Sequence, residues 1–402
     1  MAESCLKRSA PNLSRQPQGD EVKIAIFAAR STQRHYANKL SEYLRHMGAT
    51  ETQVFWYKLL WRTPYWIPTL LTKPKGSFLE VVKDFLKVKR NTPAGLIAGG
   101  KRFYALFPLK LLEAKILYSV YRNALHKQSI THMVIWNGLK FRQRIAVMAA
   151  RDLGIPCYFI ERGVFPGTTT MDPQGINFLN TIPRDPLFYM QQTSDTDPCP
   201  KLKCQELRPS QLPEHYIFVP FQVNTDSQVV MFSPWISDMF DLVKKFQQAH
   251  QTLGLQMPSI VFKPHPACEQ DYSELAQSLN KDDSPLKIIS DIPTPVLIQH
   301  AEAVCTINSS VGMESLLMGK KLIVLGNAFY DIQGIALSAA NQETLCQKLL
   351  EFSNWTPNNI LRHRFLQHLK AHHIVPGSWH DPDGQHMDSM SNRILHYIGA
   401  AN

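Results

Sequence analysis

The 402-residue sequence lacks an uninterrupted apolar stretch of the roughly 18 to 20 residues needed to cross a bilayer, so we expect no membrane-spanning helix. Residues 1–20 lack the apolar core of a secretory signal and are expected to form a polar, poorly ordered arm, which predicts that the protein is not exported. Cysteine is scarce, and its seven scattered residues match neither a disulfide framework nor paired zinc ligands. These absences predict a reducing cytoplasm and no bound metal.

Acidic residues are few in the first part of the chain. Residues 1–150 contain 25 Lys and Arg but only eight Asp and Glu, whereas the remainder contains 18 and 25, within a net charge of +10. A basic region of this kind indicates an anionic partner, such as phosphate, an acidic sugar, nucleic acid or an acidic membrane leaflet. Because the sequence has no helix-turn-helix, zinc-finger or RNP-like motif, nucleic acid is not expected.

Alternating strand and helix patterns predict two α/β domains. The first, over residues 21–200, has apolar strand patterns separated by helical patterns that end at glycines. Its predicted strands are 23–29, 131–136 and 155–160. Its predicted helices are 32–47 and 141–153. Aromatic and basic residues interleave over 54–122, a segment that is too basic for ordinary core and is expected to be an insertion.

A second α/β series follows a Pro-, Asp- and Ser-rich stretch, 193–214, which we interpret as an interdomain linker. The predicted strands of this second domain, 214–370, are 216–223, 259–263, 286–290, 303–308 and 321–326. Its predicted helices are 237–252, 271–280, 293–300, 311–318 and 342–353. The predicted fold class is α/β, with two Rossmann-like domains facing each other across a cleft and a tail, 371–402, that packs back.

A strand runs into small polar residues and a helix start within residues 305–319. Ser309 and Ser310 offer hydroxyl donors beside Gly312, and backbone N–H groups and the helix dipole favour a phosphate there. Glu314, on the first helical turn, is placed to accept hydrogen bonds from a ribose. The same pattern is also typical of an N-capped helix in an ordinary strand-to-helix turn, because Ser is a favoured cap.

Two other strand ends carry candidate residues. Lys263 and His265 follow an apolar strand and are braced by two prolines, so both are predicted to face phosphate, although a single histidine there is also often structural. Asp226 follows the strand at 216–223 and is predicted to reach into the cleft as a nucleophile or base on a sugar. The alternative is that Asp226 caps its own loop as an Asx turn.

Polar residues also follow neighbouring strands of the first domain. Asn137 and Glu161 come directly after two successive strands, so we expect them to approach each other at one edge of the sheet. Arg142 or Arg144, on the intervening helix, is a candidate to hold a carboxylate. An exposed basic helix face is the alternative.

Several motifs occur in a fixed order over residues 130–335. They are Trp136-Asn-Gly, Glu161-Arg-Gly-Val-Phe-Pro-Gly, Gly175-Ile-Asn177, Pro183-Arg-Asp-Pro-Leu-Phe-Tyr189, Gln222 to Gln228, Lys263-Pro-His-Pro266, Thr306 to Gly312 and Gly326-Asn-Ala-Phe-Tyr-Asp331. In these motifs the sequence resembles the bacterial β-Kdo transferases of capsule and lipopolysaccharide assembly, which include an O-chain-terminating relative.

The resemblance implies a GT-B-like fold, with the first domain for the acceptor, the second for the nucleotide and the donor CMP-β-Kdo between them. Carried over by position, Lys263 and His265 would contact the phosphate and the cytidine. Ser309 and Ser310 would contact the phosphate, and Glu314 the ribose. The residues expected to bind substrate are Asn137, Arg142, Arg162, Asn177 and Gln228.

The family's donor and product linkages are both β, so the resemblance implies that the anomeric centre is retained. Retention through a covalent intermediate needs a positioned carboxylate. Asp226 would attack the anomeric carbon, and Glu161 would then remove the acceptor proton. Since a phosphomonoester leaves readily, charge neutralisation by Lys263, His265 and the helix start is expected to suffice without a metal, with CMP as the product.

The resemblance also implies where the protein works. The expected acceptor is a lipid-linked glycan, ended by GlcNAc or rhamnose, at the cytoplasmic face of the bacterial inner membrane, and the segment 54–122 fits docking on that anionic leaflet. Two alternatives keep the same fold. One is a peripheral membrane scaffold that only binds nucleotide, and the other is a nucleotide-sugar 2-epimerase.

Overall fold

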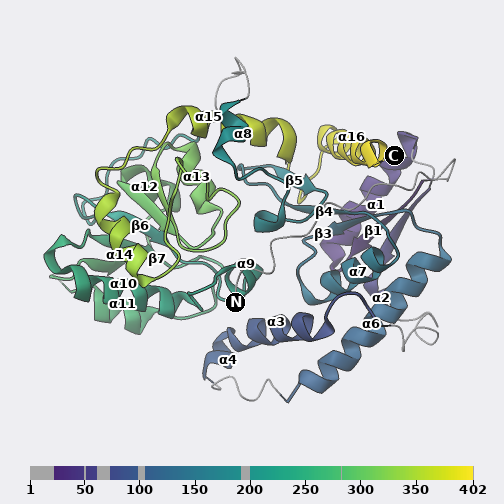
Figure 1. Cartoon of the computed structure of the whole chain (residues 1–402), viewed down its shortest axis with the longest axis horizontal. Coiled ribbons are helices and arrows are strands. Elements are labelled where there is room, and N and C mark those ends of the chain that lie inside the picture. Colours follow the sequence, from purple (N-terminus) through teal and green to yellow (C-terminus); the bar gives the residue numbers. More distant parts are fainter. Residues whose placement is uncertain are drawn as a thin grey trace.

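A computed structural model describes residues 22–48, 51–60, 73–97, 105–191, 200–281 and 283–401. The chain forms two α/β lobes that lie side by side, each built on a six-stranded sheet (Figure 1). The predicted arm at 1–20 lies outside the described residues.

The first sheet has the strand order β12-β5-β4-β3-β1-β2. Its strands are β1 (Lys23–Ala28), β2 (Glu51–Trp56), β3 (His132–Trp136), β4 (Cys157–Arg162), β5 (Thr169–Asp172) and β12 (Ile374–Val375). β1 to β4 run parallel, whereas β5 pairs antiparallel with both β4 and β12. The central strands β1 and β3 are almost wholly apolar because helices cover both faces, and each fully buried Val or Ile contributes about 1.5 to 3 kcal/mol.

Helices from distant parts of the chain cover this sheet. The first lobe contains α1 (Ser31–His46), α2 (Tyr57–Leu60), α3 (Phe78–Arg90), α4 (Pro93–Ile97), α6 (Phe107–Lys127), α7 (Phe141–Asp152) and α16 (Gly384–Ala401). α1 and α16 pack on one face, and α3, α6 and α7 pack on the other (Figure 1). The strands and helices predicted around β1, β3 and β4 are confirmed.

The expectation that the segment 54–122 is too basic for core is wrong for its helices. On α6, Leu117, Tyr118 and Tyr121 are at most 1% exposed and belong to the core on one face of the sheet. Lys115 lies on the exposed face of the same helix. An amphipathic helix separates core and charge by its periodicity, so the net charge of a segment does not decide its burial.

The second sheet is parallel throughout, with the order β8-β7-β6-β9-β10-β11. Its strands are β6 (Ile217–Pro220), β7 (Ile260–Lys263), β8 (Leu286–Ile288), β9 (Ala303–Thr306), β10 (Lys321–Val324) and β11 (Leu337–Ser338). The helices around it are α8 (Pro186–Met190), α9 (Ser227–Phe232), α10 (Met239–Leu253), α11 (Ser273–Leu279), α12 (Thr294–His300), α13 (Val311–Leu317), α14 (Gln342–Glu351) and α15 (Asn359–His368). This is the Rossmann strand order, and the five predicted strands are all present.

The second lobe begins earlier in the chain than the predicted boundaries. Ile182 and Tyr189, which the prediction places in the domain 21–200, are buried in the core of the second lobe. Residues 200–214 of the predicted linker run along the same lobe, where Leu202 packs against that core. Short segments such as this one carry too few apolar residues to show a period.

The end of the chain returns to the first lobe. β12 pairs with β5, and α16 packs against α1. The Tyr36 hydroxyl donates to His386 Nε2 at 2.8 Å, because His386 Nδ1 is engaged with the Pro376 carbonyl. The chain therefore passes between the lobes twice.

Residues that follow β3 and β4 line the same cavity as residues that follow β6, β7 and β9. The carboxyl ends of the two sheets therefore face each other across a cleft. Two Rossmann-like lobes in this arrangement form the GT-B-like fold predicted from the sequence. Within the described ranges, no helix is both long and apolar enough to cross a membrane.

Candidate active site

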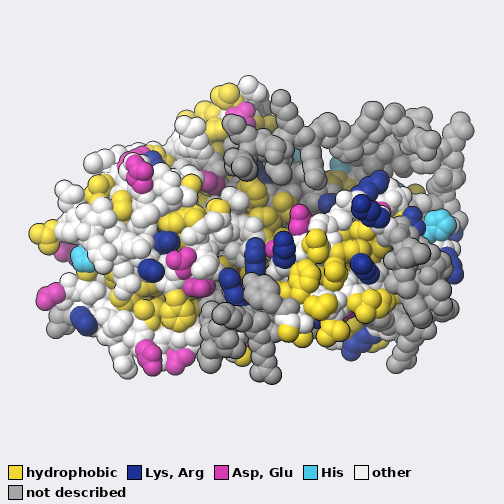
Figure 2. Space-filling model, turned by 60° about the horizontal axis from the view of Figure 1, so that its bottom comes forward, with side chains coloured by type: hydrophobic (Ala, Val, Ile, Leu, Met, Phe, Trp, Pro, Cys, Tyr) yellow, Lys and Arg dark blue, Asp and Glu magenta, His cyan; other side chains and the backbone are white. Residues whose placement is uncertain are grey.

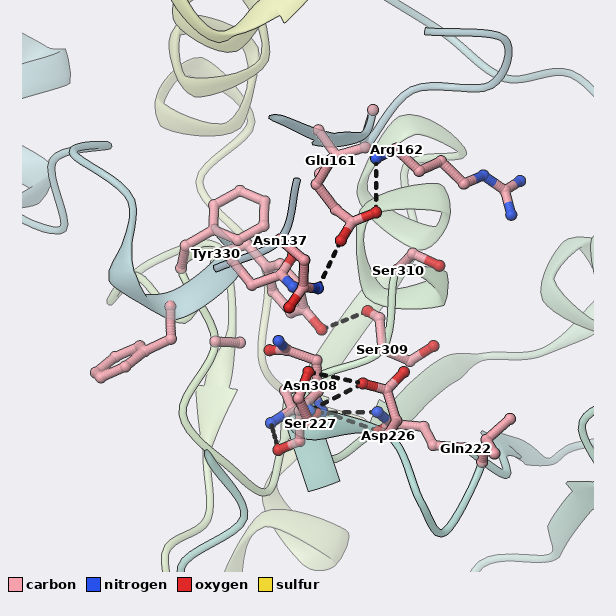
Figure 3. A pocket seen from close by; sticks show the side chains of 18 of the residues that line it. Asn137, Glu161, Arg162, Gln222, Asp226, Ser227, Asn308, Ser309, Ser310 and Tyr330 are labelled. Atoms are coloured by element: carbon pink, nitrogen blue, oxygen red, sulfur yellow. Dashed lines mark hydrogen bonds between the residues drawn. The ribbon is translucent and has the colours of Figure 1, made fainter. Parts of the chain in front are cut away.

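The cleft between the lobes contains a cavity of about 460 Å³ (Figure 3). Ten of the thirteen residues predicted for the site line it. They are Asn137, Glu161, Arg162, Asn177, Asp226, Gln228, His265, Ser309, Ser310 and Glu314. The three that do not are Arg142, Lys263 and Gly312.

The first lobe contributes a positioned carboxylate. Asn137 Nδ2 donates to Glu161 Oε2 at 2.7 Å, which confirms that these two residues approach each other, and the Arg162 backbone N–H donates to Oε1 at 3.0 Å. Asn137 has a φ of +61° and is 8% exposed. A non-glycine residue held in this region is uncommon and marks a turn that the surrounding structure fixes.

The second lobe contributes Asp226, which lies at the N-cap of α9. Its Oδ1 accepts from the Gln228 backbone N–H at 2.9 Å, so the capping interpretation of this residue is correct. The side chain also lines the cavity, and its Oδ2 accepts no hydrogen bond from any described residue. One carboxylate oxygen therefore fixes the helix start, and the other is available to a ligand (Figure 3).

Gln222 and Asn308 also line the cavity, and the sequence alone predicted no role for either residue. Gln222 Nε2 donates to Asn308 Oδ1 at 3.0 Å, and the Asn308 backbone N–H donates to Gln222 Oε1 at 3.2 Å. They follow β6 and β9, the neighbouring strands where the order of the sheet reverses. Ligands of doubly wound folds bind at this position, and it was the signal that could have found both residues.

Gln228 is buried in the wall of the cavity without a partner for its side-chain amide. It is 7% exposed, and its Nε2 has no hydrogen-bond acceptor among the residues that the structure describes. A buried polar group left unpaired costs about 1 to 3 kcal/mol. A ligand oxygen in the cavity would satisfy this donor.

Ser309 and Ser310 lead into α13 and line the cavity as predicted. Gly312 does not, because it packs against Tyr330, and a Cβ at this position would lie 2.6 Å from the Tyr330 ring. Glycine is therefore needed at this position to leave room for the Tyr330 ring, and not to let a ligand approach. The Tyr330 hydroxyl donates to the Ser309 carbonyl at 2.6 Å. This hydrogen bond fixes the serine loop, which consists of Ser309 and Ser310.

Lys263 does not face the cavity, contrary to prediction. Its Nζ donates to the carbonyl of Ser290, which follows the neighbouring strand β8. Burial lowers its pKa, and Asp291 partly opposes this effect. The backbone of β7 directs Lys263 away from the cleft, and the turn that follows brings His265 toward it.

His265 meets the cavity as a neutral ring. The Ala267 backbone N–H donates to His265 Nδ1 at 3.1 Å, which leaves the proton of the neutral ring on Nε2. Burial lowers the pKa of His265; Asp226 opposes this shift and Arg162 adds to it. At neutral pH the ring therefore offers one N–H donor to a ligand.

Glu314 of the second lobe and Arg162 of the first lobe line the same cavity. Desolvation raises the pKa of Glu314, and the charge of Arg162 opposes the shift. Arg162 lies on β4, and its charge acts on both Glu314 and His265 of the second lobe. A cation from the first lobe thus reaches the part of the cleft where the serine loop begins.

Arg142 lies in a second, neighbouring cavity. Its guanidinium is 4.7 Å from the Tyr57 ring centroid and 3.7 Å from Glu113. Among the residues that the structure describes, no group of three or more His, Cys, Asp or Glu side chains is arranged to hold a metal ion. Asp195 and Asp197, an Asp-x-Asp pair of the sequence, lie outside the described residues.

Comparison with known proteins places the chain in a family. A family model described as capsule polysaccharide biosynthesis protein matches residues 201–377. Protein FixF of Sinorhizobium fredii (strain NBRC 101917 / NGR234) is 31% identical over 298 residues, which cover 71% of this chain and 70% of FixF. The chain belongs to the capsule polysaccharide biosynthesis protein family.

Another relative is the capsule polysaccharide export protein KpsS of Escherichia coli, which is 24% identical over 66% of this chain and 86% of KpsS. Among solved structures, the chain is similar to Thermosulfurimonas dismutans KpsC, titled beta Kdo 2,4 transferase. The sequence identity is 15%, the match covers 86% of this chain and 90% of the KpsC chain, and the TM-score is 0.44. The match to UDP-GlcNAc 2-epimerase of Methanocaldococcus jannaschii has 12% sequence identity and a TM-score of 0.39, and it covers 94% of this chain and 100% of the epimerase chain. Neither structural likeness assigns a reaction.

Proposed function

We propose that this protein is a retaining glycosyltransferase that moves Kdo, an eight-carbon acidic sugar, from CMP-β-Kdo to the end of a cell-surface glycan. The observation that carries the proposal is that a carboxylate from each lobe, Glu161 from the first and Asp226 from the second, lines one cavity. The family membership and the motifs that resemble β-Kdo transferases support it.

The second lobe would hold the CMP part of the donor. The Ser309 and Ser310 hydroxyls and the His265 Nε2–H are donors suited to its phosphate. Glu314 is suited to the ribose hydroxyls, which would satisfy a carboxylate that is now partly desolvated. Arg162 would complete charge neutralisation from the first lobe.

The reaction would proceed in two displacements. The free Asp226 oxygen attacks C2 of Kdo, the bond from C2 to the phosphate oxygen breaks, and CMP leaves with the electron pair. Glu161 then takes the proton of the acceptor hydroxyl, whose oxygen attacks C2 and displaces the Asp226 carboxylate. Two inversions give a β product from a β donor.

We propose that neither displacement needs a metal. The leaving phosphate is a weak base, and its charge would be met by Arg162, the serine hydroxyls and the His265 N–H. Transfer in the presence of EDTA should equal transfer without it, and inactivation that Mg²⁺ restores would overturn this part of the proposal.

The test is transfer from CMP-Kdo, generated in place, to synthetic acceptors ended by GlcNAc or rhamnose. Asp226→Asn should abolish transfer and the Kdo adduct seen by intact-protein mass spectrometry, while still capping α9, because Asn is an equally good cap. Asp238→Asn, at the N-cap of α10 outside the cavity, is the matched control. Normal transfer by Asp226→Asn would remove this residue from the mechanism. CMP binding without transfer to any acceptor would favour a nucleotide-binding scaffold.

We further propose that the acceptor is lipid-linked and is reached at the anionic inner face of the membrane. On α6, Leu109 and Leu112 are 65% and 53% exposed beside Lys115, and Figure 2 shows apolar side chains gathered with Lys and Arg on this side of the first lobe. A double change of both leucines to Glu should reduce sedimentation with phosphatidylglycerol vesicles but leave that with phosphatidylcholine at background. Leu255→Glu, in the second lobe, is the control. Unchanged sedimentation of the double variant would contradict the proposal.

A further inference from the structure

A second cavity of about 390 Å³ adjoins the first. Lys140, Thr225 and Ser227 line both cavities, so the two share a wall. α3, α6 and α7 of the first lobe and α9 of the second surround it. Ser227 follows Asp226, and a molecule in this cavity would therefore reach the cleft beside the carboxylate.

The charge around this cavity is unbalanced. Its acidic residues are already paired, because Asp84 accepts from Arg144 at 2.6 Å and Glu113 binds Lys110. Arg30, Lys89 and Lys140 line the cavity and form neither an ion pair nor a side-chain hydrogen bond with the described part of the chain. Figure 2 shows Lys and Arg side chains collected where the two lobes meet. An anion would find uncompensated cations here.

Aromatic rings form another wall of the same cavity. Phe85 of α3 and Phe141 of α7 have ring centroids 5.0 Å apart, and the Lys110 ammonium lies 4.8 Å and 5.5 Å from them. Flat apolar surface beside cations suits a sugar that carries an acidic group, since the ring packs on the aromatic face and the acid meets the charge.

We infer that this second cavity is the acceptor subsite and that the acceptor brings a phosphate or carboxylate into it. The inference rests on the proposed function and names the acceptor class for it. Arg30 and Lys89 would bind the acidic group. Lys140, in the shared wall, would guide the reacting sugar toward Glu161 and Asp226.

Transfer kinetics with paired acceptors test the inference. The acceptors are a glycan with a terminal phosphate or carboxylate and the same glycan without it. Arg30→Gln with Lys89→Gln should raise KM for the acidic acceptor about tenfold and leave kcat, and KM for the neutral acceptor, within about twofold. Lys83→Gln, an exposed lysine of α3 that lies outside the cavity, is the control. A double variant that behaves like the control overturns the inference.

Direct binding separates failure of the inference from failure of the proposed function. Glucose 1-phosphate, glucuronate and glucose are titrated calorimetrically into the full chain with the cleft saturated by CMP. The two acidic probes, but not glucose, should bind wild type and the Lys83→Gln control, and binding should weaken about tenfold in the double variant. This outcome supports the subsite even if no Kdo transfer is found. If the acidic probes bind only when CMP is absent, and bind the double variant as well as wild type, the anion lies in the main cleft and the subsite is overturned.

Discussion

Asn137 shows how one residue serves both the backbone and the site. Its φ of +61° turns the chain after β3, and its amide holds Glu161 at 2.7 Å. Glycine adopts this φ without strain, so the two roles can be separated by substitution.

We expect Asn137→Gly to keep the turn and to lower kcat about 10- to 100-fold, because the Glu161 carboxylate loses the donor that orients it. KM for the CMP-sugar should change little, since the residues that we propose to bind the nucleotide lie in the other lobe. Initial rates of transfer measure both. Ser129→Gly, which relieves a φ of +50° outside the cavity, is the control, and a kcat equal to that control would contradict the role of the amide.

A substitution at Gly312 tests how closely the start of α13 packs against Tyr330, next to the serine loop. In Gly312→Ala the new Cβ would lie 2.6 Å from the Tyr330 ring, which is 1% exposed and cannot move aside. We expect a loss of about 1 to 3 kcal/mol in the free energy of unfolding, together with weaker CMP binding as Ser309 shifts. Urea denaturation and CMP titration measure the two effects. Gly399→Ala, which meets no atom within 4 Å, should lose no stability, and equal stability of the two variants would exclude a close packing requirement at Gly312.

At this scale the sequence predicts which residues lie near the cleft better than it predicts where they point. Residues directly after strands, such as Asn137 and Asp226, were found because parallel strands bring their carboxyl ends to one edge. Lys263 was misplaced because a side chain at the last position of a strand points to either face. Gln222 and Asn308 were missed because the signal that marks them, the reversal of strand order between β6 and β9, belongs to the assembled sheet and not to the local sequence.

At the scale of elements, the buried parallel strands were predictable from apolar runs. β2 and β12 were not, since β2 begins with Glu51, Thr52 and Gln53 at the sheet edge and β12 has only two residues. Their pairing depends on partners far away in the sequence, which local patterns do not report.

The π-helix Leu369–His373 makes stability depend on pH. Burial lowers the pKa of His373 to about 4, with Asp172 opposing and Arg393, Arg184 and His368 adding to the shift. Between pH 6.5 and 4 the unfolded chain therefore binds a proton that the folded chain does not, and stability falls as the pH is lowered through this window, by about 1.4 kcal/mol per pH unit at most.

We expect urea denaturation between pH 8 and 4.5 to show a nearly constant free energy of unfolding down to about pH 7 and a decline below it. His373→Gln should have a shallower decline, even if its stability at pH 8 is lower. A variant that declines as steeply as wild type would show that His373 is not responsible, and His396→Gln, at a histidine in a different helix, controls for the loss of any histidine.

At the scale of the whole molecule, α3 joins the lobes. Asn91, at its C-cap, is 4% exposed and donates to the carbonyls of Asn224 at 3.1 Å and Ser237 at 3.4 Å in the second lobe. Thermal unfolding should show the consequence. Asn91→Ala leaves both carbonyls without this donor, so we expect a loss of about 1 to 3 kcal/mol and a broader calorimetric transition as the lobes uncouple. Asn354→Ala, at an exposed position, is the control, and an unchanged, equally sharp transition in Asn91→Ala would argue against coupling through this contact.

The return of β12 and α16 to the first sheet has a consequence for synthesis on the ribosome. Every strand of the second lobe emerges before residue 374, whereas the face of the first sheet that holds Trp136 and is partly covered by α1 waits for α16. The lobe that is translated first is therefore completed last. A nascent chain must keep that apolar face from aggregating until α16 leaves the exit tunnel, and premature termination within α16 would release a finished second lobe attached to an open first lobe.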